Sequence, residues 1–142
     1  MTPEQITHII LHHAAMPDHV SLQWDDIKAF HTRVRKWTDI GYHVVIENVE
    51  GTYIPILARP WNQSGAHAPG YNSTSLGVCL VGNFETGPIP IAQYRCAITT
   101  VRWLCQFLQI PYRNVLGHRE TKATACPGKH IDMDEFRTNL AS

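Results

Sequence analysis

Residues 6–13, Ile6-Thr7-His8-Ile9-Ile10-Leu11-His12-His13, form a short apolar run that ends in two histidines. The run contains several β-branched residues and is too short for a typical helix, so it predicts a strand buried inside a sheet. Because side chains alternate along a strand, His12 and His13 should point to opposite faces of that sheet. At most one of the two can therefore easily share a site with residues from elsewhere in the chain.

Three segments predict helices. The first begins at Ser21, a favourable N-cap, and carries an apolar stripe at spacings of three and four made by Ile27, Phe30, Val34 and Trp37. The second covers residues 91–109 between Pro90 and Pro111, and Cys105 belongs to its apolar stripe. A brief third helix is expected at about residues 132–140.

Four more segments predict strands: 42–46, 53–57, 76–81 and 114–116. Glu50-Gly51 is a plausible hairpin turn between the first two, and residues 59–73 form a long loop of the kind that is often functional. Alternating strands and helices with one hairpin predict an α/β fold, with a central mixed β-sheet flanked by helices. We expect one domain over residues 1–142, since the chain has no internal repeat and no linker.

Composition narrows the possible functions. The chain has 12 basic and 12 acidic residues and a formal net charge of zero, which argues against a dedicated nucleic-acid binder. No secretory signal and no apolar run of about 18 residues is visible, so we expect a soluble product made in the cytoplasm, without stable membrane association. The four cysteines form no CxxC pair, and free thiols are expected in a reducing compartment.

Near the end of the chain, Gly117-His118-Arg119-Glu120 is followed by Ala125-Cys126-Pro127-Gly128. The seven residues between His118 and Cys126 are enough to bring both side chains onto one ion, and His12 would join them from the end of a central strand. Three such ligands leave a fourth position open for water, as in catalytic zinc sites. The alternative is that His118 is a surface residue and Cys126 a small buried hydrophobe.

Five segments together carry a more specific signal. They occur in order at residues 10–15 (ILHHAA), 37–43 (WTDIGYH), 65–72 (GAHAPGYN), 75–84 (SLGVCLVGNF) and 117–128 (GHRE through ACPG). Each segment alone is weak, but the ordered set resembles the zinc amidase family that includes short phage lysozymes and animal peptidoglycan recognition proteins. The resemblance covers nearly the whole chain.

This resemblance implies a zinc-dependent N-acetylmuramoyl-L-alanine amidase, which cuts the amide between the muramic acid lactyl group and the first L-alanine of the stem peptide. It also implies a zinc ion in a surface groove, held by His12, His118 and Cys126. Tyr42 matches the catalytic tyrosine of the family. Ala14 stands where a Ser or Thr is usual, which is a mild departure.

The resemblance leaves other roles open. Two residues before the cysteine, phage enzymes carry a lysine and recognition proteins often a threonine; this chain has Thr124, with Lys122 nearby. Either could assist the oxyanion, Thr124 through its hydroxyl or Lys122 through its charge. His67 and Asn72, in the long matching loop, are expected to contact the glycan or peptide. For Asn72 the alternative is a turn residue that satisfies its own backbone.

Several biological roles fit such a site. With no signal peptide and no separate wall-binding segment, the chain resembles a compact phage or prophage endolysin that acts on peptidoglycan after release through a membrane pore. A cytosolic muropeptide-recycling amidase and a non-catalytic peptidoglycan-binding module are the alternatives, although modules of that kind commonly lack the cysteine. One phage relative also inhibits its phage's RNA polymerase, and only that analogy supports a polymerase partner for this chain.

Overall fold

The computed structural model describes residues 1–16 and 24–142. Its centre is a five-stranded sheet with the order β3-β2-β4-β1-β5. The strands are β1 (His8–His13), β2 (Val44–Val49), β3 (Thr52–Leu57), β4 (Ser75–Leu80) and β5 (Val115–Gly117). Only the β2–β3 pairing is antiparallel, and the other neighbouring strands run parallel. This confirms the predicted α/β fold with a mixed sheet.

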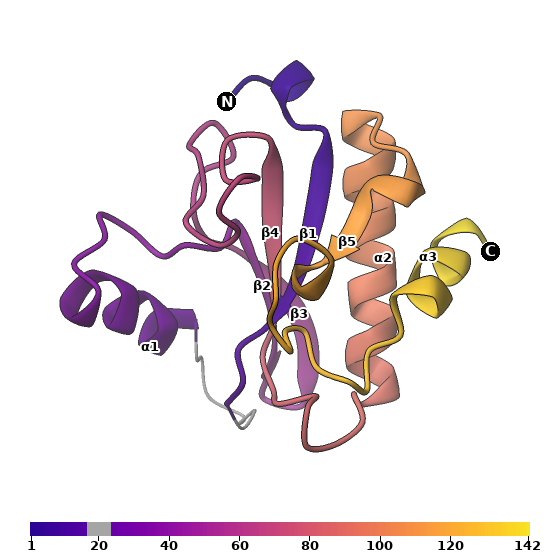
Figure 1. Ribbon diagram of the computed structural model, residues 1–142. Coiled ribbons are helices and arrows are strands. Elements are labelled where there is room, and N and C mark those ends of the chain that lie inside the picture. Colours follow the sequence, from indigo (N-terminus) through magenta and orange to yellow (C-terminus); the bar gives the residue numbers. More distant parts are fainter. Residues whose placement is uncertain (17–23) are drawn as a thin grey trace.

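Helices lie on both sides of the sheet (Figure 1). On one side, α2 (Ile91–Leu108) and α3 (Met133–Ala141) pack against each other and the strands. On the other side lies α1 (Trp24–Ala29), which continues into the π-helical turn η2 (Phe30–Val34). Short 3₁₀ turns complete the chain: η1 (Pro3–Gln5), η3 (Tyr112–Asn114) and η4 (His118–Glu120). None of the helices in the described ranges combines the length and the apolar character that a bilayer crossing requires.

The alternation of side chains along the strands divides the interior into two clusters. Ile9 and Leu11 of β1 join the larger cluster, which includes Val101 and Leu104 of α2. The smaller cluster, on the α1 side, includes Val45 and Cys79. His12 of β1 is paired with Cys79 of β4, and paired residues of neighbouring strands point to the same face of a sheet. The side chains of His12 and Cys79 therefore both lie on the α1 side.

The first predicted helix differs from expectation. Its proposed N-cap, Ser21, lies outside the described residues. The regular helix ends at Ala29, and Trp37 lies beyond the η2 turn. Ile27 is buried, but the side chains of Phe30 and Val34 are 46% and 65% exposed. The stripe is not a continuous core face, because only the start of this helix packs onto the sheet.

Most other elements appear where the sequence predicts them. The turn at Glu50-Gly51 has positive φ at both residues, 53° and 93°, as a tight hairpin requires. Cys105 is 2% exposed in the large cluster, as its place in the apolar stripe of α2 predicts. Tyr42, expected to open a strand, instead lies two residues before β2. The two residues before the strand are nevertheless bonded to their neighbours: the Tyr42 carbonyl accepts from the Arg59 N–H, and the His43 N–H donates to the Gly77 carbonyl of β4.

Candidate metal centre and groove

Three side chains from distant parts of the chain converge at one point. One ligand atom from each of His12, His118 and Cys126 lies within 4.8 Å of the other two. The Sγ of Cys126 is 3.7 Å from Nδ1 of His12, and tetrahedral zinc with ordinary bond lengths would separate such atoms by about 3.6 Å. His118 Nε2 is buried and has no hydrogen-bond partner among the described residues. The donor set and its spacing therefore fit a metal ion.

The backbone around these residues is fixed by bonds within the site loop. His118 follows β5, which pairs with β1, and so comes close to His12. The backbone N–H of Arg119 donates to the carbonyl of Cys126 at 2.7 Å, which ties the two ligand segments together. The Arg119 guanidinium donates to the Gly128 carbonyl at 2.9 Å. Glu120 accepts from the Gly117 N–H at 2.7 Å and pairs with Arg137. Arg119 and Glu120 thus hold the loop in place.

Burial controls the charge states of the three candidate ligands. It lowers the pKa of His12 well below the usual value, with smaller contributions from His67 and His118, and it also lowers the pKa of His118. Both imidazoles are therefore neutral at pH 7, as metal ligation requires. Burial raises the pKa of the Cys126 thiol to about 11. A divalent cation between the three groups would reverse that last effect and favour the thiolate.

Tyr42 lies against this cluster. Its ring centroid is 5.1 Å from that of His12. Burial raises the pKa of its hydroxyl well above the usual 10, and the thiols of Cys79 and Cys126 add to the shift. The Cys79 thiol lies close enough to the hydroxyl to interact with it. Tyr42 is therefore a protonated hydrogen-bond donor at neutral pH, as a group that assists an oxyanion must be.

Cys79 is the site neighbour that sequence reasoning missed, since a mid-strand cysteine is usually an inert core thiol. It is fully buried, but it contacts Tyr42 and interacts with Cys126. The register of β1 and β4, which places it opposite His12, is the signal that could have identified it.

His67 and Asn72 lie where the long loop meets the cluster, and both line the groove. His67 Nδ1 is 2.9 Å from His12 Nε2, and His67 is only 7% exposed. Burial lowers its pKa to about 3. Asn72 Oδ1 accepts from the N–H groups of His67 and Ala68, both at 2.8 Å, which is the turn role left open by the sequence. Substrate contact by these two residues stays a prediction.

Thr124 and Lys122 both line the same groove. The hydroxyl of Thr124 accepts a long bond of 3.4 Å from the Cys126 N–H, and Lys122 is close enough for its charge to lower the pKa of His118. Both can face a substrate bound over the cluster, so the structure keeps the two candidates that the sequence leaves open.

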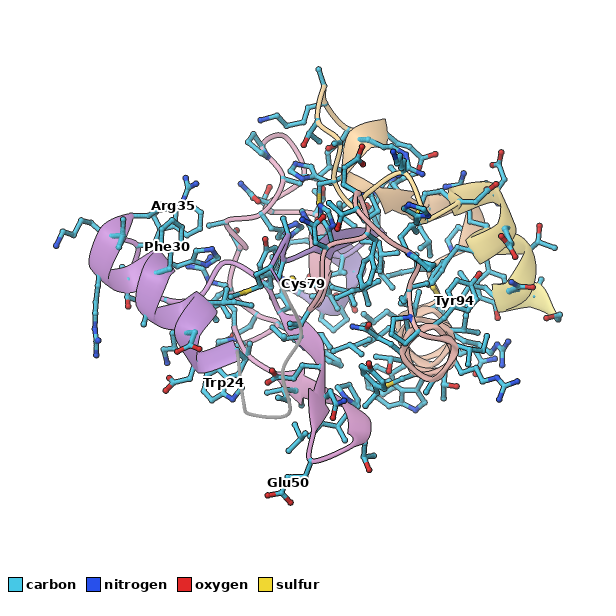
Figure 2. All side chains as sticks on the ribbon, turned by 90° about the horizontal axis from the view of Figure 1, so that it is seen from below. Trp24, Phe30, Arg35, Glu50, Cys79 and Tyr94 are labelled. Carbon is cyan, nitrogen blue, oxygen red and sulfur yellow. The ribbon has the colours of Figure 1, made fainter. Side chains whose placement is uncertain are left out.

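The groove has a volume of about 990 Å³ and the metal-ligand cluster lies within it. The α1–η2 helix supplies one wall, where the Arg35 guanidinium lies 5.4 Å from both the Phe30 and Trp37 rings. Figure 2 shows Phe30 and Arg35 on this helix, with Cys79 at the centre and Tyr94 far away on the α2 side. Fold and site together define an α/β protein with a candidate metal centre in an open groove, an arrangement that suits hydrolysis assisted by a metal ion.

Comparison with known proteins narrows this class. The model of the N-acetylmuramoyl-L-alanine amidase family matches residues 2–129. The chain belongs to that family. A peptidoglycan-recognition protein of Drosophila melanogaster is 40% identical over 129 residues, covering 87% of this chain and 69% of that protein. The endolysin of Klebsiella phage KP32 is 31% identical over 127 residues, covering 87% and 82%.

Solved structures agree with the family assignment. The N-acetylmuramoyl-L-alanine amidase LysC of Clostridium intestinale superposes with a TM-score of 0.81 at 26% identity, covering 99% of this chain and 89% of that one. A point mutant of Drosophila PGRP-LB in complex with tracheal cytotoxin has a TM-score of 0.78 at 31% identity, covering 89% and 77%. The predicted resemblance is thus confirmed, and family membership supports peptidoglycan amidase activity.

Proposed function

We propose that this protein is a zinc-dependent N-acetylmuramoyl-L-alanine amidase that hydrolyses the bond between N-acetylmuramic acid and L-alanine in peptidoglycan. One observation carries the proposal: the ligand atoms of His12, His118 and Cys126 lie within 4.8 Å of each other in an open groove. Three protein ligands leave a tetrahedral ion one free position, which suits catalysis better than a structural role.

In this proposal the residues of the site have two roles, metal binding and stabilisation of the oxyanion. His12, His118 and Cys126 would hold the ion, which when bound polarises a carbonyl and lowers the pKa of a bound water. Tyr42, kept protonated by its surroundings, donates a hydrogen bond to the scissile carbonyl oxygen as negative charge develops there. The Thr124 hydroxyl provides a second, neutral donor, and Lys122 is the charged alternative.

For the biological role we propose a phage or prophage endolysin. The match to the Klebsiella phage KP32 endolysin over most of both chains supports this role. The protein would be made in the cytoplasm and would act on the peptidoglycan layer after release through a membrane pore. Peptidoglycan is then its partner, in line with the tracheal cytotoxin seen bound to similar recognition proteins.

A non-catalytic peptidoglycan-binding module is the second candidate, because several relatives carry the name recognition protein. The presence here of both Cys126 and Tyr42 favours catalysis. A cytosolic amidase that recycles soluble muropeptides is a third role for the same chemistry.

Mass spectrometry of digested peptidoglycan tests all three. Purified protein with zinc should release intact stem peptides that begin with L-alanine from whole sacculi, and a chelator should stop the release. Binding to sacculi without any release would support the recognition module instead. Release from soluble fragments but not from sacculi would support the recycling enzyme.

A further inference from the structure

We propose that His67 is a positioning residue that sets the tautomer and ring orientation of His12, rather than a wall residue that contacts substrate. This inference rests on the proposed binding of a metal ion by His12. The ring of His67 lies nearly perpendicular to that of His12, at an interplanar angle of 88°, with His67 Nδ1 2.9 Å from His12 Nε2. Metal-binding histidines usually donate their second ring N–H to such a fixed acceptor.

The direction of this hydrogen bond follows from the metal-facing atom. His12 Nδ1 points at Cys126 Sγ and must be unprotonated to bind an ion. The single proton of neutral His12 is then on Nε2, which donates to His67 Nδ1. In turn the proton of His67 is on Nε2, which faces the Ser75 hydroxyl at 3.4 Å. Ser75 donates to the Tyr71 carbonyl at 2.7 Å. The hydrogen bonds from His12 through His67 and Ser75 to the Tyr71 carbonyl can therefore all be formed with a single set of proton positions.

Packing also restricts the position of the His67 ring. A Cβ atom at Gly77 of β4 would lie 2.6 Å from His67 Cγ, and one at Gly65 would lie 2.4 Å from His67 Cδ2. Contacts that short cannot form, so only glycine at these two positions leaves the space the ring fills. We name this space the glycine slot of Gly65 and Gly77. The backbone of His67 is held as well, through its N–H bond to Asn72.

The slot also argues against substrate contact. His67 is 7% exposed, and both of its ring nitrogens already face partners inside the protein. A ring with no free nitrogen has little to offer a substrate in the groove, but it can hold the neighbouring ligand in the geometry that the ion needs.

Two variants of similar shape separate these roles. His67→Asn puts Oδ1 where Nδ1 is now and keeps an acceptor for His12, whereas His67→Leu has the same branching and no acceptor. Competition with a chromophoric chelator should show zinc binding about 10–100-fold weaker in His67→Leu, and most of that loss recovered in His67→Asn. Unfolding of the metal-free proteins shows whether both variants fold.

A second measurement does not depend on either variant. In ¹⁵N-labelled, metal-free wild type, the imidazole nitrogen shifts should show a protonated Nε2 on His12 and an unprotonated Nδ1 on His67. The opposite assignment would overturn the inference.

Equal zinc affinity in wild type and His67→Leu would also overturn the inference. It would do so most clearly if both variants raised KM for peptidoglycan fragments, because loss of a substrate contact has that effect. If the wild-type protein binds no zinc, the proposed function itself is refuted. If wild type binds zinc and His67→Leu binds it equally well, only the role of His67 is refuted.

Discussion

The two faces of the central sheet carry different kinds of side chain, although both are built from the same strands. Toward α2, β1 presents Ile9 and Leu11 to a large apolar cluster. Toward α1 it presents His12, opposite Cys79 and next to the glycine slot. Figure 2 shows α2 on one side of the molecule and the α1–η2 helix on the other. The larger apolar cluster lies on the α2 face and the candidate metal ligands lie on the α1 side, so changes on each face should have separable effects.

The largest expected effect is on the α1 face, at Cys126. Cys126→Ser replaces the proposed thiolate ligand with a neutral hydroxyl, so zinc affinity should fall by more than the roughly 10–100-fold that loss of an outer hydrogen-bond partner costs. Peptidoglycan cleavage should be lost with it. Metal analysis and a turbidity assay measure both, with Cys96→Ser on α2 as the control. Zinc content equal to wild type would refute the ligand assignment.

A core truncation on the α2 face should show the converse pattern. Leu104 is 1% exposed, and Leu104→Ala should lower the free energy of unfolding by about 2–5 kcal/mol. Zinc affinity and cleavage by the folded fraction should stay within about twofold of wild type, because the sheet separates the residue from the groove. Phe107→Ala on the same helix, where the side chain is 63% exposed, is the control. A matching loss of zinc affinity in Leu104→Ala would show that the faces are coupled.

A substitution at Tyr42 probes the proposed oxyanion donor and leaves the three candidate metal ligands in place. Tyr42→Phe removes only the hydroxyl, and the loss of a well-placed oxyanion donor costs roughly 10²–10³ in turnover in a well-studied case. We expect at least a tenfold lower kcat, measured on soluble peptidoglycan fragments, with full zinc content. Tyr94→Phe, which loses a bond to Asn139 on the α2 side, is the matched control. Unchanged turnover in Tyr42→Phe would remove this residue from the mechanism.

The smallest effect concerns pH. His31 is 7% exposed, and its Nδ1 accepts from the Gly41 N–H at 2.9 Å. Burial, with help from Arg35 and Arg59, lowers its pKa to about 4. Unfolded histidine titrates near 6.5, so between these values the unfolded state binds more protons. The stabilising contribution of His31 is complete above about pH 6.5 and is lost as the pH falls toward 4.

His31→Asn keeps an acceptor for Gly41 but cannot titrate. In excess chelator, its free energy of unfolding should therefore fall less than that of wild type between pH 7 and pH 4.5. Denaturant unfolding measures the difference, and exposed His130→Asn should behave as wild type. Identical losses in all three proteins would contradict the assignment to His31.

The sequence predicts this fold well wherever one periodicity dominates. The apolar strand that ends at His13, the hairpin at Gly51 and the stripe of α2 all appear within about two residues of their expected places. The helix around Phe30 is less well predicted. Its apolar residues indicate burial, but part of it forms a groove wall, and a repeat of three and four cannot distinguish a core from a cleft.

For the site, the motifs predict the candidate ligands but not the residues that position them. His118 and Cys126 are close in sequence, and the family pattern adds His12. The contact between His67 and His12 spans 55 residues, and it depends on the parallel pairing of β1 with β4, which no local pattern encodes. The proximity of Cys79 to Tyr42 could not be predicted for the same reason. Long-range register, rather than residue type, is the missing information.

The glycine slot has a consequence for how mutations in this chain should be interpreted. Gly65 and Gly77 bring no functional group to the reaction, but even a methyl group at either position would push against the imidazole that holds His12. A search restricted to polar or charged side chains would pass over both positions. At Gly77 the useful contribution is empty volume, and a substitution as mild as alanine would disturb the candidate ligand His12 through the ring of His67.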